Sequence, residues 1–104
     1  MKVVVVLTTV GADFDTAALA KSLVEQRVAA CVNILPGVES IYRWKNGIED
    51  DREQLLLIKT TEERVNALRE ALFAVHPYEV PEFVVLAAEA GGAYTEWLAD
   101  SVRG

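Results

Sequence analysis

The dipeptide Asn46-Gly47 separates two strand-like runs, and it constrains the fold more than any other feature of the sequence. Both residues tolerate the positive φ angles of a two-residue type I′ turn, so the pair predicts a β-hairpin. Its strands are expected over 31–45 and 48–60. Pro36-Gly37 interrupts the first of them, and because proline lacks the N–H that a sheet requires, this strand should be kinked or lie at an edge.

A turn at Asn46-Gly47 also predicts the register of the hairpin. Lys45 would pair with Ile48, and Arg43 would lie opposite Asp50 as a pair of opposite charges. The acidic run 49–53 is then most simply a solvated strand face.

The remaining chain has helical or strand periodicity in five segments. They are an apolar strand over 2–9, a helix with Asp13 as N-cap, a helix that starts after Thr60 and ends before Pro77, a strand over 82–88 and a short helix over 94–102. Thr60 and Glu63 fit a capping box for the second helix. Tyr94 and Trp97 of the last helix are expected to face inward.

The element order β-α-β-β-α-β predicts an α+β, ferredoxin-like sandwich formed by a single domain over 1–104. Right-handed crossovers pack two helices on one face of a four-stranded antiparallel sheet. The apolar, proline-free strands belong in the centre and the proline-bearing strands at the edges. The expected strand order is therefore 4-1-3-2, with a long hairpin between the second and third strands and a short C-terminal helix.

The hairpin over 38–53 is expected to extend beyond the helices. A helix of about 15 residues spans about 22 Å, whereas a strand rises about 3.3 Å per residue. An isolated ribbon is marginal in water, yet this one carries Ile41, Tyr42 and Trp44. We expect these side chains to be buried against another subunit.

Composition excludes several classes of protein. The net charge of −6 and pI of about 4.7 oppose binding to nucleic acid and favour cations. The longest apolar run is far shorter than the roughly 20 residues of a membrane span, so we expect a soluble chain without a membrane partner. The absence of a signal-peptide pattern and the single cysteine suit a cytoplasmic location.

The segment HPYEVPE, residues 76–82, holds the only histidine. His76 could complement the end of the second helix, which is the simpler interpretation. It could instead bind a metal weakly with Glu79 or Glu82, if other chains supply further ligands. Cys31 is most simply an inert core residue.

Other residues suggest a ligand cleft. Lys59 could bind an anion beside a helix N-terminus or simply extend its amine to solvent. Four aromatic residues could pack an interface or stack on a ligand: Tyr42, Trp44, Tyr78 and Trp97.

Four segments, AACVNILPGVESIYRW, LLLIKTT, HPYEVPE and YTEWL, resemble the CutA family of divalent-cation tolerance proteins, in order, over about residues 3–102. The resemblance implies a ferredoxin-like homotrimer similar to PII signalling proteins, with hairpins that extend sheets between subunits. It also implies an association with copper and other divalent cations, and it makes clefts between subunits the expected binding surfaces.

The family's proposed metal positions match His76 and Cys31. Thr8 and Val75 stand where some members have cysteine and a second histidine, ligand types that copper prefers. The expected metal residues are thus His76, Cys31 and Glu79, with Cu²⁺ as the expected cation, bound neither tightly nor obligatorily. The expected cleft residues are Tyr42, Trp44, Lys59, Tyr78, Glu79, Glu82 and Trp97.

Three functions fit these observations. The first is a trimeric, non-enzymatic protein of cation homeostasis. The second is a PII-like sensor that binds a small anion or metabolite near Lys59, Tyr78 and Glu79. The third, an enzyme using His76 with a glutamate as acid and base, is the weakest, because no nucleophile elbow, P-loop or dinucleotide fingerprint occurs.

Overall fold

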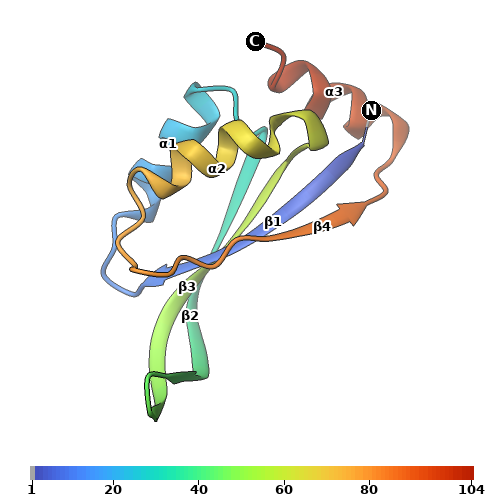
Figure 1. The fold of residues 1–104 in the computed structure, drawn as a ribbon. Coiled ribbons are helices and arrows are strands. Elements are labelled where there is room, and N and C mark those ends of the chain that lie inside the picture. The colour runs from blue at the N-terminus through green and yellow to red at the C-terminus, as the bar shows by residue number, and fades with distance from the viewer. Residues whose placement is uncertain (1) are drawn as a thin grey trace.

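The computed structural model describes residues 2–104 and contains a four-stranded antiparallel sheet in the order β2-β3-β1-β4 (Figure 1). The ferredoxin-like fold and the predicted strand order are confirmed. The elements are β1 (Val3–Gly11), α1 (Thr16–Glu25), β2 (Cys31–Trp44), β3 (Gly47–Thr61), a 3₁₀ turn (Glu62–Arg64), α2 (Val65–Phe73), β4 (Val84–Ala88) and α3 (Gly92–Ser101).

Helices α1 and α2 cover one face of the sheet (Figure 1). Side chains alternate along a strand, so every second residue of β1 and β3 points towards these helices. The resulting core includes Val6, Ile58, Leu23 and Leu68, each at most 1% exposed. The proline-free strands β1 and β3 are the two central strands, as predicted.

The predicted register of the hairpin is wrong. The two turn residues are Lys45 and Asn46, and Trp44 pairs with Gly47. Of these two, only Lys45 has a positive φ, at 55°. Arg43 consequently lies opposite Ile48, so the predicted pairing of Arg43 with Asp50 does not form.

Pro36 and Gly37 lie at an irregularity in β2, where the pairing with β3 shifts between Leu35 and Val38. Gly37 has a φ of +74°, which lies in the left-handed region that favours glycine. The chain thus continues as one kinked edge strand, as the proline predicts.

Two helix starts also differ from prediction. Asp15, not Asp13, caps α1, and its side chain accepts a hydrogen bond from the Ala18 amide at 3.2 Å. The capping box of Thr60 and Glu63 does not form, because the buried Thr60 hydroxyl donates to the Val28 carbonyl at 2.9 Å. Thr60 still faces the core from β3, and this orientation directs its hydroxyl away from the helix start.

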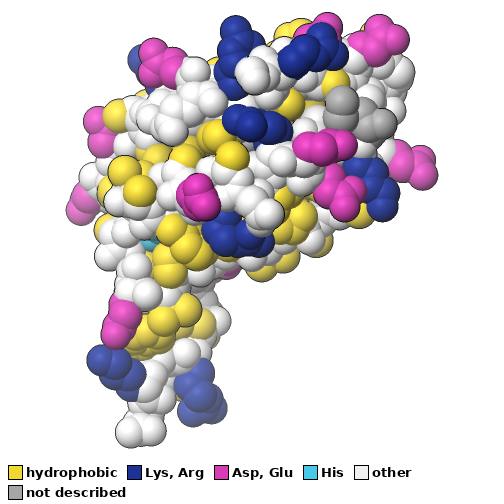
Figure 2. All heavy atoms as spheres, turned by 45° about the horizontal axis from the view of Figure 1, so that its top comes forward, with side chains coloured by type: hydrophobic (Ala, Val, Ile, Leu, Met, Phe, Trp, Pro, Cys, Tyr) yellow, Lys and Arg dark blue, Asp and Glu magenta, His cyan; other side chains and the backbone are white. Residues whose placement is uncertain are grey.

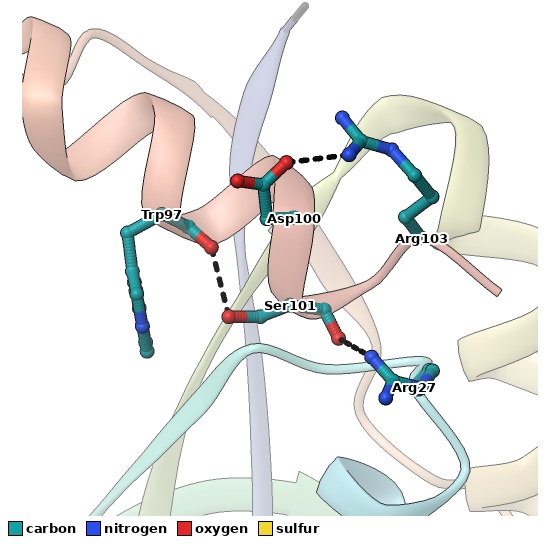
Figure 3. Close-up of polar contacts among 5 residues, drawn as sticks. All are labelled: Arg27, Trp97, Asp100, Ser101 and Arg103. Carbon is teal, nitrogen blue, oxygen red and sulfur yellow. Dashed lines mark hydrogen bonds and ion pairs between the residues drawn. The ribbon is translucent and has the colours of Figure 1, made fainter.

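Helix α3 closes one end of the sheet through Leu98 and Val102, which pack with Val3, Ala30 and Ala88. Figure 3 shows its C-terminal end, where Arg27 donates to the Ser101 carbonyl at 3.3 Å and Arg103 pairs with Asp100 at 2.7 Å. Tyr94 and Trp97 are 40% and 46% exposed, so the expectation that they face inward is wrong.

Apolar residues also occupy the sheet face opposite α1 and α2. Val4 and Val6 point into the core, so the alternating residues Val5 and Leu7 point to this second face. The residues that pair with a second-face residue on a neighbouring strand point to the same face. The second face therefore carries Val5, Leu7, Leu35, Leu55, Leu57, Val84 and Leu86.

The hairpin extends well beyond the helices (Figure 1), and the molecule measures 45 × 24 × 22 Å along its principal axes. Ile41 and Ile48 of the hairpin are 68% and 62% exposed. Figure 2 shows hydrophobic side chains on the hairpin above basic ones at its tip. The predicted protrusion is present, and it displays apolar side chains.

No helix within residues 2–104 is both long and apolar enough to cross a membrane.

Candidate functional site: an acidic, aromatic groove

An open groove of about 710 Å³ lies between the hairpin and the connection from α2 to β4. Its walls contain three carboxylates, three aromatic side chains and no lysine or arginine. The lining residues are Thr9, Ser40, Ile41, Tyr42, Trp44, Glu53, Pro77, Tyr78, Glu79, Val80 and Glu82.

The connection after α2, residues 74–83, takes the place of a strand beside β1. Strand β4 pairs with β1 only from Val3 to Leu7, which leaves the following carbonyls of β1 without a β4 partner. His76 supplies one, because its Nε2 lies 3.0 Å from the Thr9 carbonyl oxygen and 3.3 Å from the Thr8 hydroxyl. The first role of HPYEVPE is therefore to attach this connection to the sheet.

Both ring nitrogens of His76 are engaged. The Tyr78 amide donates to Nδ1 at 3.1 Å, so Nδ1 is unprotonated. The Thr9 carbonyl accepts only, so Nε2 carries the proton and the imidazole is neutral. Burial lowers the pKa of His76 from 6.5, although the Thr9 carbonyl and the Glu53 charge oppose that shift. A metal could bind His76 only if one of these hydrogen bonds were broken.

Glu53 lines the groove and is 5% exposed. Its carboxylate accepts a hydrogen bond from the Tyr78 hydroxyl. The prediction of a solvated strand face is wrong for this residue. Alternation along β3 places Glu53 on the same face as Leu55, a signal available in the sequence, but the cover that Tyr78 provides comes from a segment 25 positions away.

Burial and neighbouring carboxylates raise the pKa values of three groups in the groove. Burial raises the pKa of Glu82 from 4.5, and the Glu53 carboxylate raises it further. Burial also raises the pKa of Tyr78, and its hydrogen bond to Glu53 acts in the same direction. The hydrogen bond from Tyr42 to Asp51 raises the pKa of Tyr42 to about 12. Both tyrosines therefore remain protonated donors at neutral pH.

The structure brings together five of the seven expected cleft residues: Tyr42, Trp44, Tyr78, Glu79 and Glu82. Lys59 lies six positions along β3 from Glu53, about 20 Å away along an extended strand. Its amine lies 5.9 Å from the centre of the Tyr94 ring, and Tyr94 lies 5.3 Å from Trp97. Lys59 and Trp97 thus form a separate cluster at α3.

The three expected metal residues do not meet within one chain. Cys31 is half-buried and pairs across the sheet with Lys59, which pairs in turn with Val5. His76 contacts Thr9 of β1. Thr9 lies four positions after Val5, which is about 13 Å along the strand. Within residues 2–104, no group of three or more His, Cys, Asp or Glu side chains is close enough to hold a metal ion.

The family model described as "CutA1 divalent ion tolerance protein" matches residues 4–101. This chain belongs to the CutA1 family. The divalent-cation tolerance protein CutA of Thermus thermophilus is 49% identical over 98 residues, which cover 93% of this chain and 95% of that protein. The human protein CutA is 47% identical over 81 residues, 77% of this chain. This chain spans only 45% of the human protein's length.

Solved CutA1 structures have the same fold. That of the Thermus thermophilus protein has a TM-score of 0.91 at 47% identity, covering 97% of this chain and 99% of that chain. CutA1 from Oryza sativa has a TM-score of 0.93 at 42% identity, covering 99% and 95%. The family name associates these proteins with tolerance of divalent cations, and the groove lies within the matched region.

Proposed function

We propose that this CutA1 protein is a non-enzymatic homotrimer that contributes to divalent-cation tolerance by binding such cations weakly and reversibly. The observation that carries the proposal is the groove, whose walls hold Glu53, Glu79 and Glu82 and no basic side chain. A cleft lined by charges of one sign concentrates ions of the opposite sign. Weak binding suits this geometry, because residues 2–104 of one chain provide no compact set of three ligands.

The groups present fit hard divalent cations better than a preformed copper site. Carboxylate oxygens suit cations such as Mg²⁺ and Mn²⁺, whereas copper favours imidazole and sulfur ligands. Both ring nitrogens of His76 are hydrogen-bonded. Cys31 pairs with Lys59 across the sheet, away from the groove. Cu²⁺ binding through His76, with Glu79 beside it, would require a rearrangement of the connection or ligands from a neighbouring subunit.

Calorimetry of the assembled protein tests this function with Mn²⁺ and Cu²⁺ as probes. We expect Glu82→Gln to weaken Mn²⁺ binding, and His76→Ala to weaken Cu²⁺ binding if the imidazole is released. Glu25→Gln, at the exposed end of α1, is the matched control because it removes the same charge far from the groove. Unchanged uptake of both metals in Glu82→Gln and in His76→Ala would contradict the proposal.

The trimer is supported by the second face of the sheet and by the hairpin. That face presents a continuous row of apolar residues, and the hairpin exposes Ile41 and Ile48. Soluble monomers rarely expose apolar surfaces of this extent. We propose that neighbouring subunits cover both, and that the protein works in the cytoplasm.

A second candidate function is a sensor that binds a small molecule in the same groove. Its volume of about 710 Å³ and the rings of Tyr42, Trp44 and Tyr78 favour this candidate. Lys59 lies beside Tyr94 and not in the groove, so the groove formed by residues 2–104 lacks the positive charge that an anionic ligand would require. A thermal-shift screen of metabolites checks it, and the absence of any shift across the screen would count against it.

A further inference from the structure

The Glu53 carboxylate is largely buried, and no basic side chain of residues 2–104 pairs with it. Glu53 is 5% exposed, and the Tyr78 hydroxyl is the one side chain within residues 2–104 that hydrogen-bonds it. No lysine or arginine of this region forms an ion pair with it. Burying a carboxylate is costly unless a charge of opposite sign accompanies it. The Tyr78 hydroxyl is neutral, so it leaves the negative charge of Glu53 uncompensated where this residue lines the groove, and a positively charged group there would be attracted to it.

The form of the groove indicates which kind of cation fits there. A bare metal ion needs several ligands within one coordination sphere, and no such group occurs in residues 2–104. Glu53, Glu79 and Glu82 are instead distributed along a groove of about 710 Å³, a volume typical of sites for small organic molecules. Glu53 and Glu82 lie close enough for their charges to interact, which leaves Glu79 for a second positive charge of the same ligand.

Aromatic rings favour an organic cation further. Tyr42, Trp44 and Tyr78 line the same groove, and the face of an aromatic ring attracts an ammonium group. The tip of the hairpin already contains such a contact, because the Lys45 amine lies 5.7 Å from the centre of the Trp44 ring. The apolar side chain of Val80, which also lines the groove, suits the methylene groups between two amines.

We propose that the groove binds an aliphatic diamine or polyamine, with one ammonium group at Glu53 and Glu82 and the methylene chain along the aromatic rings. This inference rests on the groove as a binding site and goes beyond divalent-cation tolerance. It assigns Glu53 a direct role in recognition and gives the ligand of the groove a chemical class.

Calorimetry with diaminobutane as the probe tests the inference on the assembled protein. We expect saturable binding that weakens as salt is added, and no binding of the uncharged analogue butanediol. Glu53→Gln and Glu82→Gln should each weaken binding by roughly tenfold or more, because each removes a charge that the ammonium contacts. Trp44→Ala should weaken it by about two- to fivefold through loss of the ring.

Glu25→Gln is the control, and its effect should stay within about twofold because long-range attraction between exposed charges is screened. If Glu53→Gln does not fold, Glu82→Gln tests the same ammonium contact, because Glu82 is only half-buried and its substitution should be tolerated. Equal binding of butanediol, equal weakening by Glu25→Gln, or no diamine binding at millimolar concentration would each overturn the inference.

A parallel titration with Mn²⁺ separates this inference from the proposed function. Loss of the diamine signal with intact Mn²⁺ binding overturns the ligand class alone. Diamine binding without any uptake of Mn²⁺ or Cu²⁺ supports the inference and counts against the cation-tolerance mechanism.

Discussion

At the scale of single residues, His76 is explained by its hydrogen bonds before any metal is considered. It joins Thr9 of β1 to the amide of Tyr78. Removing it with His76→Ala should lower the free energy of unfolding by about 1–2 kcal/mol, because two partly buried groups lose their partner. Urea denaturation of the metal-free protein measures this loss, and an unchanged midpoint would show that the contact is dispensable.

The pH dependence of His76 follows from its lowered pKa. Below pH 6.5 the unfolded chain binds a proton at this site more readily than the folded chain does. Its contribution to stability is therefore present at higher pH and decreases as pH falls from about 6.5 towards the lowered folded-state pKa. NMR titration should give a midpoint below 6.5, with the Nε2–H tautomer above it. A midpoint above 6.5 would show that burial does not dominate.

Glu82 has the opposite dependence, because its folded-state pKa is raised. Its ionisation opposes folding as pH rises from 4.5 through the folded-state pKa. Because solvent screens a charge that is only partly buried, we expect Glu82→Gln to stabilise the protein at pH 7 by no more than about 0.5 kcal/mol and to have a smaller effect at pH 4. Denaturation curves at the two pH values check this, and a larger gain at pH 4 would contradict it.

At the scale of elements, the kink of β2 depends on Gly37. Nothing lies within 4 Å of a Cβ added there, so the φ of +74° alone opposes a side chain. Gly37→Ala should cost about 1–2 kcal/mol, and Gly37→Asn less, because asparagine tolerates the left-handed region better. Thermal or urea denaturation measures both costs.

Gly92→Ala is the matched control for this prediction. Gly92 begins α3, also has nothing within 4 Å and has no positive φ, so alanine should be neutral or slightly stabilising there. Equal destabilisation by the two alanine variants would show that backbone conformation is not the cause.

At the scale of the whole molecule, the apolar second face of the sheet determines assembly in the proposed trimer. Leu86 of β4 lies on this face and is 47% exposed in the single chain. A charge there would be buried at the interface without a partner, so Leu86→Lys should convert trimer to monomer at micromolar concentration. Sedimentation velocity measures the change.

The control is Val24→Lys on α1, which is 41% exposed and lies on a helix that covers the other face of the sheet. It should leave the assembly intact. A wild-type chain that sediments as a monomer at micromolar concentration would remove the trimer from the proposal.

The sequence alone was enough to predict the element order, the central and edge strands and the protruding hairpin, because these depend on local periodicity, on proline and on strand length. It did not determine the hairpin register, since a two-residue loop can form one position earlier at little cost when Lys45 accepts a positive φ. The resemblance carried by HPYEVPE and its neighbours indicated the family, which the matched region 4–101 confirms.

The arrangement of the site could not be predicted in the same way, because it depends on tertiary contacts. Glu53 is buried because Tyr78 covers it, and His76 is neutral because its partners come from β1 and from its own connection. The same packing separates Cys31 and Lys59 from the groove. Burial, hydrogen-bond partners and the distances between charges depend on contacts between segments far apart in sequence, so a pattern of nearby residues contains little information about them.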